Sequence, residues 1–293
     1  MLESRVLSGM RILITGGSGW LGQETLCLLA KLQESRLHFS ISILTGSGAI
    51  FDVHGKEHSP QKFAEASLDE DFDLIIHLAF ILPSRIELLS QENYIALNRE
   101  ITSRMASVLR RNPNALKLLV SSGASTLKHG QSVNPNVVLY GELKRDMEER
   151  LFDENTLILR IWSITGHHIP PHSKYALTDF LINATSNREI IIENNILRSY
   201  VAAQDIIGAS LAYLINGGRG IVNSGGDKIA LSSLAFSVVK VLKSRSSIHI
   251  LNSNFDTELN YVSPPCEIPN KFTSSFSTLN EQVEDLKFSF IGS

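Results

Sequence analysis

Short apolar runs alternate along the first half of the chain with longer segments whose apolar residues recur every three or four positions. Continuous apolar runs are typical of strands buried on both faces of a parallel sheet, and the spaced residues are typical of helices that cover such a sheet. The pattern therefore predicts an α/β fold with a doubly wound parallel sheet. The expected strands are 10–14, 38–46, 71–80, 115–120 and 156–164, and the expected helices are 20–35, 88–111 and 140–152.

The pattern changes in the second half, where turns become frequent and strands become short. The segment 166–175 is a proline-interrupted loop, and 190–205 fits two short strands that turn at Asn194 and Asn195. Asp205 is expected to cap the helix that follows it. This part therefore predicts a smaller, mixed unit at the open end of the sheet, with helices at 176–185, at 206–216 and after residue 232.

A glycine-rich turn, TGGSGWLG, links the first expected strand to the first expected helix. Gly16 lets the chain turn sharply, Gly19 lets a pyrophosphate approach the backbone, and Gly22 lets the helix pack close to the strand. The N–H groups and partial positive charge at the helix N-terminus then favour phosphate. A bare glycine spacing is common, but a strand before it and a helix after it are what a dinucleotide site requires, so the sequence predicts one here.

The end of the second expected strand bears on the choice between NAD and NADP. An acidic side chain there favours NAD, and a nearby arginine favours NADP. This chain has Thr45, Gly46 and Ser47, so nothing repels a 2′-phosphate and two hydroxyls can bond one. We therefore expect NAD or NADP as the cofactor, with a slight preference for NADP.

Composition and charge narrow the class of protein. Of 293 residues, 43% are hydrophobic and 19% are charged, and the net charge is −3, as in an ordinary soluble globular protein without a nucleic-acid surface. No apolar run is long enough to cross a membrane. Two cysteines, Cys27 and Cys266, are too few for a disulfide framework or a zinc site. We therefore expect a cytoplasmic protein that binds small molecules and neither nucleic acid nor membrane.

Tyr140 and Lys144 lie four residues apart on an expected helix, so their side chains share one face. A tyrosine has a pKa of ~10 in water, and a neighbouring ammonium group lowers it. Such a pair can move a proton to or from a hydroxyl near neutral pH. The spacing alone is also common on solvated helix faces, so its meaning depends on the rest of the chain.

Four motifs supply that context, because they occur in the order of a known family. They are TGGSGWLG, DLIIHLA at the third strand, LLVSSGAS at the end of the next strand, and YGELK beyond it. From about residue 10 to residue 225 the chain resembles the extended short-chain dehydrogenases/reductases, specifically the NAD-dependent epimerase/dehydratase family that acts on nucleotide sugars. The resemblance implies a Rossmann domain at 1–165, to which 199–223 return, and a smaller substrate-binding domain at 166–293.

The resemblance also implies catalytic roles. Tyr140 is the expected acid/base, Lys144 is expected to bind the nicotinamide ribose and lower the Tyr140 pKa, and Ser122 is expected to bond the reacting oxygen. Ser121 and Ser125 are alternatives to Ser122, because the register of the motif is not fixed. The implied cofactor-binding residues are Gly16, Gly19, Trp20, Leu21, Thr45, Leu78, Ala79, Tyr140 and Lys144.

Two other positions are matched near the cofactor, and two helices are matched to a homodimer. Asn93 corresponds to the asparagine that opens the family's N-V-x-G-T helix, whereas His77 is expected to be structural. The dimer is implied through the helix after Leu88 and the helix that carries Tyr140. Their apolar residues are Leu89, Ile101, Met105, Leu109, Leu143, Met147 and Leu151.

A further group of residues is matched to the substrate. Arg198, followed by Ser-Tyr-Val and then Asp205, has the spacing of the family's arginine that grips a diphosphate, a task suited to a planar cation with several donors. Ser163 replaces an asparagine that often contacts the substrate phosphate. The Asp-Glu pair of the family's dehydratases reads Gly123-Ala124 here, which argues against dehydration. The implied substrate-binding residues are Ser122, Ser163 and Arg198.

His167, His168 and His172 lie close together in the loop after residue 166 and raise the question of a metal site. Prolines interrupt this loop and no carboxylate or cysteine is near in sequence, so ligand geometry is not assured. We expect a polar loop on the substrate side and predict no metal.

These observations predict an NAD(P)-dependent epimerase or reductase of a nucleotide-diphosphate sugar, in which Tyr140 handles the proton. Two alternatives stay open: an NADPH-dependent reductase of a carbonyl compound without a nucleotide, and a regulator that senses a dinucleotide without turnover. An Arg198 that points away from the pocket would favour the first alternative. The intact Tyr140–Lys144 pair argues against the second.

Overall fold

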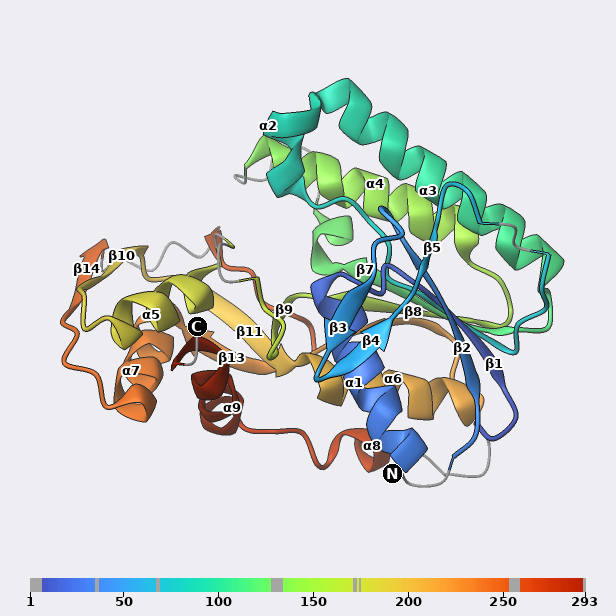
Figure 1. Cartoon of the computed structure of the whole chain (residues 1–293). Coiled ribbons are helices and arrows are strands. Elements are labelled where there is room, and N and C mark those ends of the chain that lie inside the picture. The colour runs from blue at the N-terminus through green and yellow to red at the C-terminus, as the bar shows by residue number, and fades with distance from the viewer. Residues whose placement is uncertain are drawn as a thin grey trace.

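The structure is a computed structural model of the whole chain. It describes residues 7–34, 37–66, 69–127, 134–170, 173, 175–252 and 259–291. Figure 1 shows a large sheet with helices on both faces, beside a smaller group of strands and helices formed by the second half of the chain.

The large sheet is parallel throughout, and the predicted doubly wound fold is confirmed. Within the described residues seven strands form it, in the order β12-β8-β7-β6-β1-β2-β5, and every adjacent pair is parallel. Their bounds are β1 (Arg11–Thr15), β2 (Ser40–Thr45), β5 (Gln61–Lys62), β6 (Leu74–His77), β7 (Leu116–Ser122), β8 (Thr156–Ile161) and β12 (Gly220–Asn223).

Successive apolar residues of each central strand point to opposite faces, which is why the strands read as unbroken apolar runs. In β1, Ile12 and Ile14 belong to one buried cluster, whereas Leu13 between them belongs to another. Helices α1 (Trp20–Glu34) and α6 (Ala203–Ile215) cover the first face, and α3 (Gln91–Arg111) and α4 (Pro135–Leu151) cover the second.

The smaller group has its own apolar cluster, and its described strands form two short sheets. The sheet β13-β11-β9 continues from the large sheet, because the chain leaves β8 and enters β9 after the single residue Trp162. Its strands are β9 (Ser163–Thr165), β11 (Leu197–Ala202) and β13 (Asp227–Ala230), and in the second sheet β10 (Ile190–Asn194) pairs with β14 (Ile248–Asn252). Outside this group, β3 (Phe51–Val53) pairs with β4 (Lys56–His58) in a hairpin that packs with α1. The accompanying helices are α5 (Ala176–Thr185), α7 (Leu231–Leu242), α8 (Asn270–Thr273) and α9 (Leu279–Ile291). The division into two domains stays a prediction.

Three predicted element boundaries are wrong. The helix expected at 88–111 is broken after α2 (Ile86–Leu89) by Ser90, whose φ is 63° and whose hydroxyl accepts from the Asn93 N–H. Asp205 does not cap α6, because that helix begins two residues earlier, and its carboxylate instead accepts from Ser277 N at 2.7 Å. The helix of Tyr140 begins five residues earlier than expected, at Pro135.

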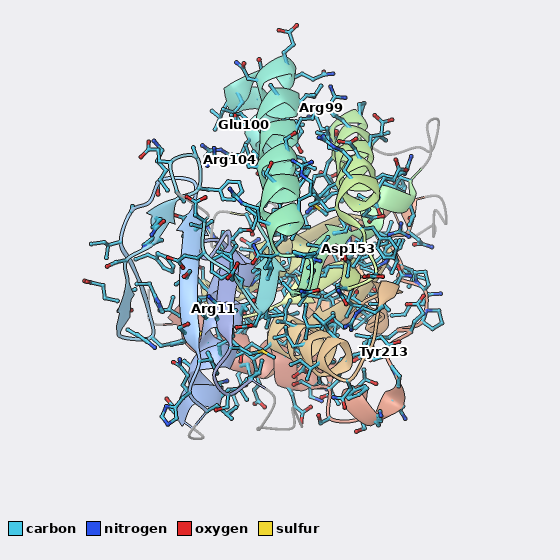
Figure 2. The ribbon with its side chains drawn as sticks, turned by 90° about the vertical axis from the view of Figure 1, so that its right-hand side faces the viewer. Arg11, Arg99, Glu100, Arg104, Asp153 and Tyr213 are labelled. Carbon is cyan, nitrogen blue, oxygen red and sulfur yellow. The ribbon has the colours of Figure 1, made fainter. Side chains whose placement is uncertain are left out.

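The apolar residues proposed for a dimer interface are mostly covered within the chain. Met105, Leu109, Met147 and Leu151 lie in the cluster beneath α3 and α4, and Leu143 is buried beside them. The outward side of α3 carries charged residues, among them Arg99 and Glu100, which Figure 2 labels together with Arg104. A homodimer stays a prediction, and it would need other contacts. Among the described helices, none combines the length and apolarity needed to cross a membrane.

Candidate active site

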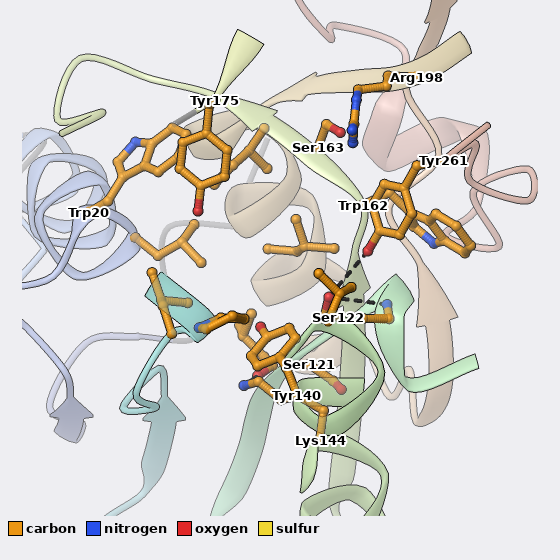
Figure 3. Close-up of a pocket in the computed structure, with 18 of the residues that line it drawn as sticks. Trp20, Ser121, Ser122, Tyr140, Lys144, Trp162, Ser163, Tyr175, Arg198 and Tyr261 are labelled. Carbon is orange, nitrogen blue, oxygen red and sulfur yellow. Dashed lines mark hydrogen bonds between the residues drawn. The ribbon is translucent and has the colours of Figure 1, made fainter. Parts of the chain in front are cut away.

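A cavity of about 1220 Å³ lies between the large sheet and the smaller group of strands. The glycine turn after β1 lines one side of it, and Arg198 of β11 lines another (Figure 3). Pockets for single drug-sized ligands occupy roughly 300–1,000 Å³. The cavity is therefore large enough for two ligands that meet inside it.

The glycine turn has the shape that the sequence predicts for a phosphate cradle. Gly16 has a φ of 78°, and a Cβ on it would lie 2.7 Å from the Ala79 nitrogen. A Cβ on Gly22 would collide with the Gly16 carbonyl, so only glycine lets α1 start this close to β1. On Gly19 a Cβ would meet only the Gly16 oxygen, at 3.3 Å. The turn and the free N–H groups of the α1 N-terminus thus fit a dinucleotide pyrophosphate.

Most of the predicted cofactor residues line the cavity, and two do not. Thr45 is buried, and its hydroxyl accepts from the Gly48 N–H at 3.0 Å. Ala79 packs behind Gly16 and donates its N–H to the Thr15 hydroxyl at 3.4 Å. The contacts of Thr45 and Ala79 with a cofactor therefore stay predictions. The residues that do line the cavity are Gly16, Gly19, Trp20, Leu21, Leu78, Tyr140 and Lys144.

Ser122 lines the cavity at the end of a central strand. It ends β7, and its Oγ accepts from the Ala124 N–H at 3.2 Å while lying 3.3 Å from the Tyr261 hydroxyl (Figure 3). Ser121 donates its hydroxyl to Glu148. Ser125 is buried and does not line the cavity. Of the three alternatives from the sequence, the geometry favours Ser122.

Tyr140 reaches Ser122 because α4 packs tightly on the turn that follows β7. A Cβ on Gly141 would collide with the Ala124 carbonyl, so this glycine permits the close approach. Tyr140 and Ser122 both line the cavity, and the Tyr140 ring packs edge-on against Phe80 with centroids 5.5 Å apart. The elements therefore bring phenol and serine together at one point in the cavity.

Gly141→Ala tests this packing. The added methyl group would overlap the Ala124 carbonyl, and overpacking of this kind costs typically about 1–3 kcal/mol. We expect a lower midpoint of urea unfolding. Gly208→Ala in α6 is the control, because its Cβ would make an ordinary contact with Leu28 at 3.6 Å. Equal stability of the two variants would contradict the close approach of α4.

Lys144 lies beneath the phenol and is buried. Its Nζ donates to the Val120 carbonyl at 2.9 Å and lies 4.0 Å from the centre of the Phe80 ring and 6.0 Å from that of Tyr140. Burial lowers the pKa of Lys144 to about 7, although Glu148 opposes the shift. At neutral pH the amine is therefore close to its titration point.

The predicted lowering of the Tyr140 pKa is not seen. Burial raises the pKa of Tyr140 above its ordinary value, and Tyr261 adds to that rise. Interaction with Ser122 opposes the shift. Burial thus favours the neutral, protonated form of the phenol.

The opposite side of the cavity is built from β9, β11 and the segment after residue 258. Arg198 and Ser163 both line it (Figure 3). The Arg198 guanidinium lies 5.7 Å from the centre of the Tyr261 ring, and no carboxylate in the described part of the chain forms an ion pair with it. A planar cation in this position can bind a diphosphate with several hydrogen bonds.

Tyr261 is a site residue that sequence reasoning missed. Its backbone N–H donates to the Leu197 carbonyl at 3.0 Å, which holds it beside β11, and its ring packs on Trp162 with centroids 4.7 Å apart. Burial raises its pKa, partly offset by hydrogen bonding to Ser122. Its segment carries no motif and no clear periodicity, so the sequence held no signal for its position.

The match of Asn93 to the family helix is wrong by five residues. Asn93 is exposed in the first turn of α3. Asn98 is buried, and its side-chain oxygen accepts from Ile81 N at 2.9 Å. Thr102 follows four residues later, which is the spacing of asparagine and threonine in the family's N-V-x-G-T helix. His77 is buried and bonds Thr15 at 2.7 Å, and burial lowers its pKa to about 3, as suits a neutral structural residue.

The histidines after β9 do not face the substrate side. His167 and His168 do not line the cavity, whereas Ile169 of the same loop does. The His168 N–H donates to Glu24 of α1 at 2.9 Å. The prediction of a polar substrate loop is therefore wrong for these two residues, and His172 lies outside the described residues.

The chain is similar in sequence and in fold to known UDP-sugar 4-epimerases. A UDP-glucose 4-epimerase from Cyamopsis tetragonoloba is 26% identical over 200 residues. The match covers 57% of this chain and 55% of that protein, so the chain spans about half the length of this curated relative. The solved UDP-N-acetylglucosamine 4-epimerase from Methanobrevibacter ruminantium, in complex with UDP-N-acetylmuramic acid, has a TM-score of 0.72 at 16% identity, covering 97% of this chain and 99% of that one. At this identity the structural likeness shows the fold.

A second solved structure bears on the cofactor. The UDP-glucose 4-epimerase from Thermus thermophilus was solved in complex with NAD; its TM-score is 0.68 at 14% identity, covering 97% of this chain and 100% of that one. The comparisons give no support to the predicted preference for NADP. The profile of the NAD-dependent epimerase/dehydratase family matches residues 12–225, which is most of the chain. The chain belongs to the NAD-dependent epimerase/dehydratase family.

Proposed function

We propose that this protein is an NAD-dependent epimerase that inverts a hydroxyl-bearing carbon of a UDP-sugar. The observation that carries the proposal is that the glycine turn, the Ser122–Tyr140 pair and Arg198 all line one cavity. The relatives described above, which are UDP-sugar 4-epimerases, support the choice of substrate class. Because Arg198 faces the cavity, the alternative of a carbonyl substrate without a nucleotide is weakened.

Residues on different sides of the cavity have different roles in the proposed reaction. Bound NAD supplies the hydride chemistry at the reacting carbon. Tyr140 would exchange a proton with the reacting hydroxyl, and Ser122, which lines the cavity with it, would orient that oxygen. Arg198 holds the diphosphate at the other side of the cavity, so the sugar lies between the two. Gly123 and Ala124 offer no carboxylate for the elimination of water.

A panel of nucleotide sugars tests this proposal. The purified protein, loaded with a catalytic amount of NAD, is incubated with UDP-glucose, UDP-galactose and their N-acetyl derivatives, and the products are followed by NMR. An epimerase returns the hydride it removes, so we expect many turnovers per cofactor. Product formation only in proportion to added NADPH would instead identify a reductase, and no product with any sugar would contradict the proposal.

Replacing Arg198 tests the diphosphate contact. Hydrogen bonds to charged groups contribute roughly 1.5–3 kcal/mol, so Arg198→Ala should raise the KM for the UDP-sugar about ten- to a hundredfold. The Kd for UDP alone should rise with it, while the Kd for NAD should not change. Arg99→Ala, on the exposed side of α3, is the control (Figure 2). An unchanged Kd for UDP would rule out this role.

A further inference from the structure

A second cluster of reactive side chains lies outside the cavity. It combines Cys27 of α1, His54 between β3 and β4, and His168 after β9. The thiol sulfur and one ring nitrogen of each histidine all lie within 4.8 Å of one another. These residues are far apart in sequence and none lines the cavity, so the proposed reaction does not account for their convergence.

Glu24 fixes one member of the cluster from behind. It is fully buried one helical turn before Cys27, and its Oε1 accepts from the His168 N–H at 2.9 Å and lies 3.2 Å from His168 Nδ1. Its other oxygen accepts from Gln204 at 2.8 Å. Glu24 thus holds the His168 backbone and lies beside its ring, as carboxylates commonly do around metal-bound histidines.

His54 is held in an uncommon backbone conformation. Its φ is 52°, a region that residues other than glycine rarely occupy. The turn is stabilised by Asp52, whose carboxylate accepts from Gly55 N at 2.8 Å. The His54 ring then lies edge-on to His168 with centroids 5.2 Å apart. The hairpin thus presents an exposed imidazole to the buried thiol.

We propose that Cys27, His54 and His168 bind a zinc ion, with water as the fourth ligand and Glu24 orienting His168. One thiolate and two imidazoles suit zinc, whereas magnesium and calcium require oxygen ligands. On binding, the Cys27 proton passes to solvent and a sulfur–zinc bond forms. Tetrahedral zinc would bring the ligand atoms to about 3.5 Å from one another, a small closure that the exposed His54 side chain can supply.

The ion would join α1, the β3–β4 hairpin and the loop after β9. The loop after β9 also carries Ile169, which lines the cavity. A metal there stabilises the folded protein by binding it in preference to the unfolded chain. The site therefore acts as a structural clamp, and it does not depend on the proposed epimerase activity.

Cobalt replaces zinc in the test because it reports its ligands by absorption. The full-length protein is freed of metal with a chelator and titrated with Co²⁺, and bound metal is also counted by mass spectrometry. We expect stoichiometric binding with a thiolate-to-cobalt charge-transfer band in the near ultraviolet, displaced by Zn²⁺. Absence of stoichiometric binding, or binding without the charge-transfer band, would overturn the site.

Single substitutions identify the ligands, and one of them is made at an exposed residue so that the fold survives. Cys27→Ser should abolish the charge-transfer band, but Cys27 is buried, so His54→Ala is the decisive variant because His54 is exposed. His54→Ala should lose cobalt binding and the rise in melting temperature that Zn²⁺ gives the wild type. His58→Ala, on the same hairpin, should keep both. Retention of cobalt in His54→Ala, or its loss in His58→Ala, would contradict the assignment.

Discussion

Tyr140→Phe is expected to lower turnover by about a hundredfold or more, the usual scale for loss of a general acid–base group. The substitution removes only the hydroxyl, while the ring keeps its edge contact with Phe80. Ser122 retains its bonds to Ala124 N and Tyr261, so no buried group is left without a partner. Steady-state kinetics on the epimerised UDP-sugar measure the loss, and thermal melting shows that the fold survives.

Tyr261→Phe is the matched control, because Tyr261 is a second phenol that lines the cavity. Tyr140 has Lys144 beneath its ring, whereas Tyr261 contacts the Ser122 hydroxyl and is held at β11 beside Arg198. We therefore expect Tyr261→Phe to reduce turnover less than tenfold, on the scale of one neutral hydrogen bond of roughly 1 kcal/mol. A larger loss in Tyr261→Phe than in Tyr140→Phe would move the acid/base role to Tyr261.

Gly19→Val is expected to abolish measurable NAD binding without unfolding the protein. Gly19 lies in the turn that lines the cavity, where the pyrophosphate would lie, and a Cβ on it would meet only the Gly16 oxygen. Isothermal titration calorimetry with NAD measures the affinity. The melting temperature should stay near that of the wild type, because nothing behind Gly19 is displaced.

The control for Gly19→Val is Gly208→Ala, which changes a glycine that does not line the cavity and should leave the NAD affinity unchanged. An NAD affinity of Gly19→Val equal to that of the wild type would show that the pyrophosphate lies elsewhere. Weak binding in both variants would point to a general loss of folding, which the melting curves would reveal.

The central strands were predictable because burial on both faces leaves an unbroken apolar run. The glycine turn was predictable because its spacing follows from sterics at Gly16 and Gly22. The first residues of helices were harder to predict from the sequence. Pro135–Leu139 belongs to α4, but its residues lack the apolar spacing that marks the rest of the helix. Asn98 could have been chosen over Asn93, because it shares a helix face with buried Tyr94 and Thr102.

Other features depend on contacts that no local pattern records. Tyr261 reaches Ser122 only because its strand-like segment pairs with β11, more than 60 residues earlier in the chain. Cys27 lies in a helix, His54 in a hairpin turn and His168 in a loop, and only the folded chain brings the three together. The pKa of Tyr140 could not be read from its spacing to Lys144, because burial outweighs the neighbouring amine.

Epimerisation of a UDP-sugar that carries deuterium at the reacting carbon tests the central claim most directly. In the proposed reaction the hydride removed from this carbon would return to it, and Tyr140 would exchange only the hydroxyl proton. NMR of the equilibrated product should therefore show deuterium fully retained at the inverted carbon in ordinary water. Loss of that deuterium to solvent would show inversion by proton abstraction from carbon and would contradict the account.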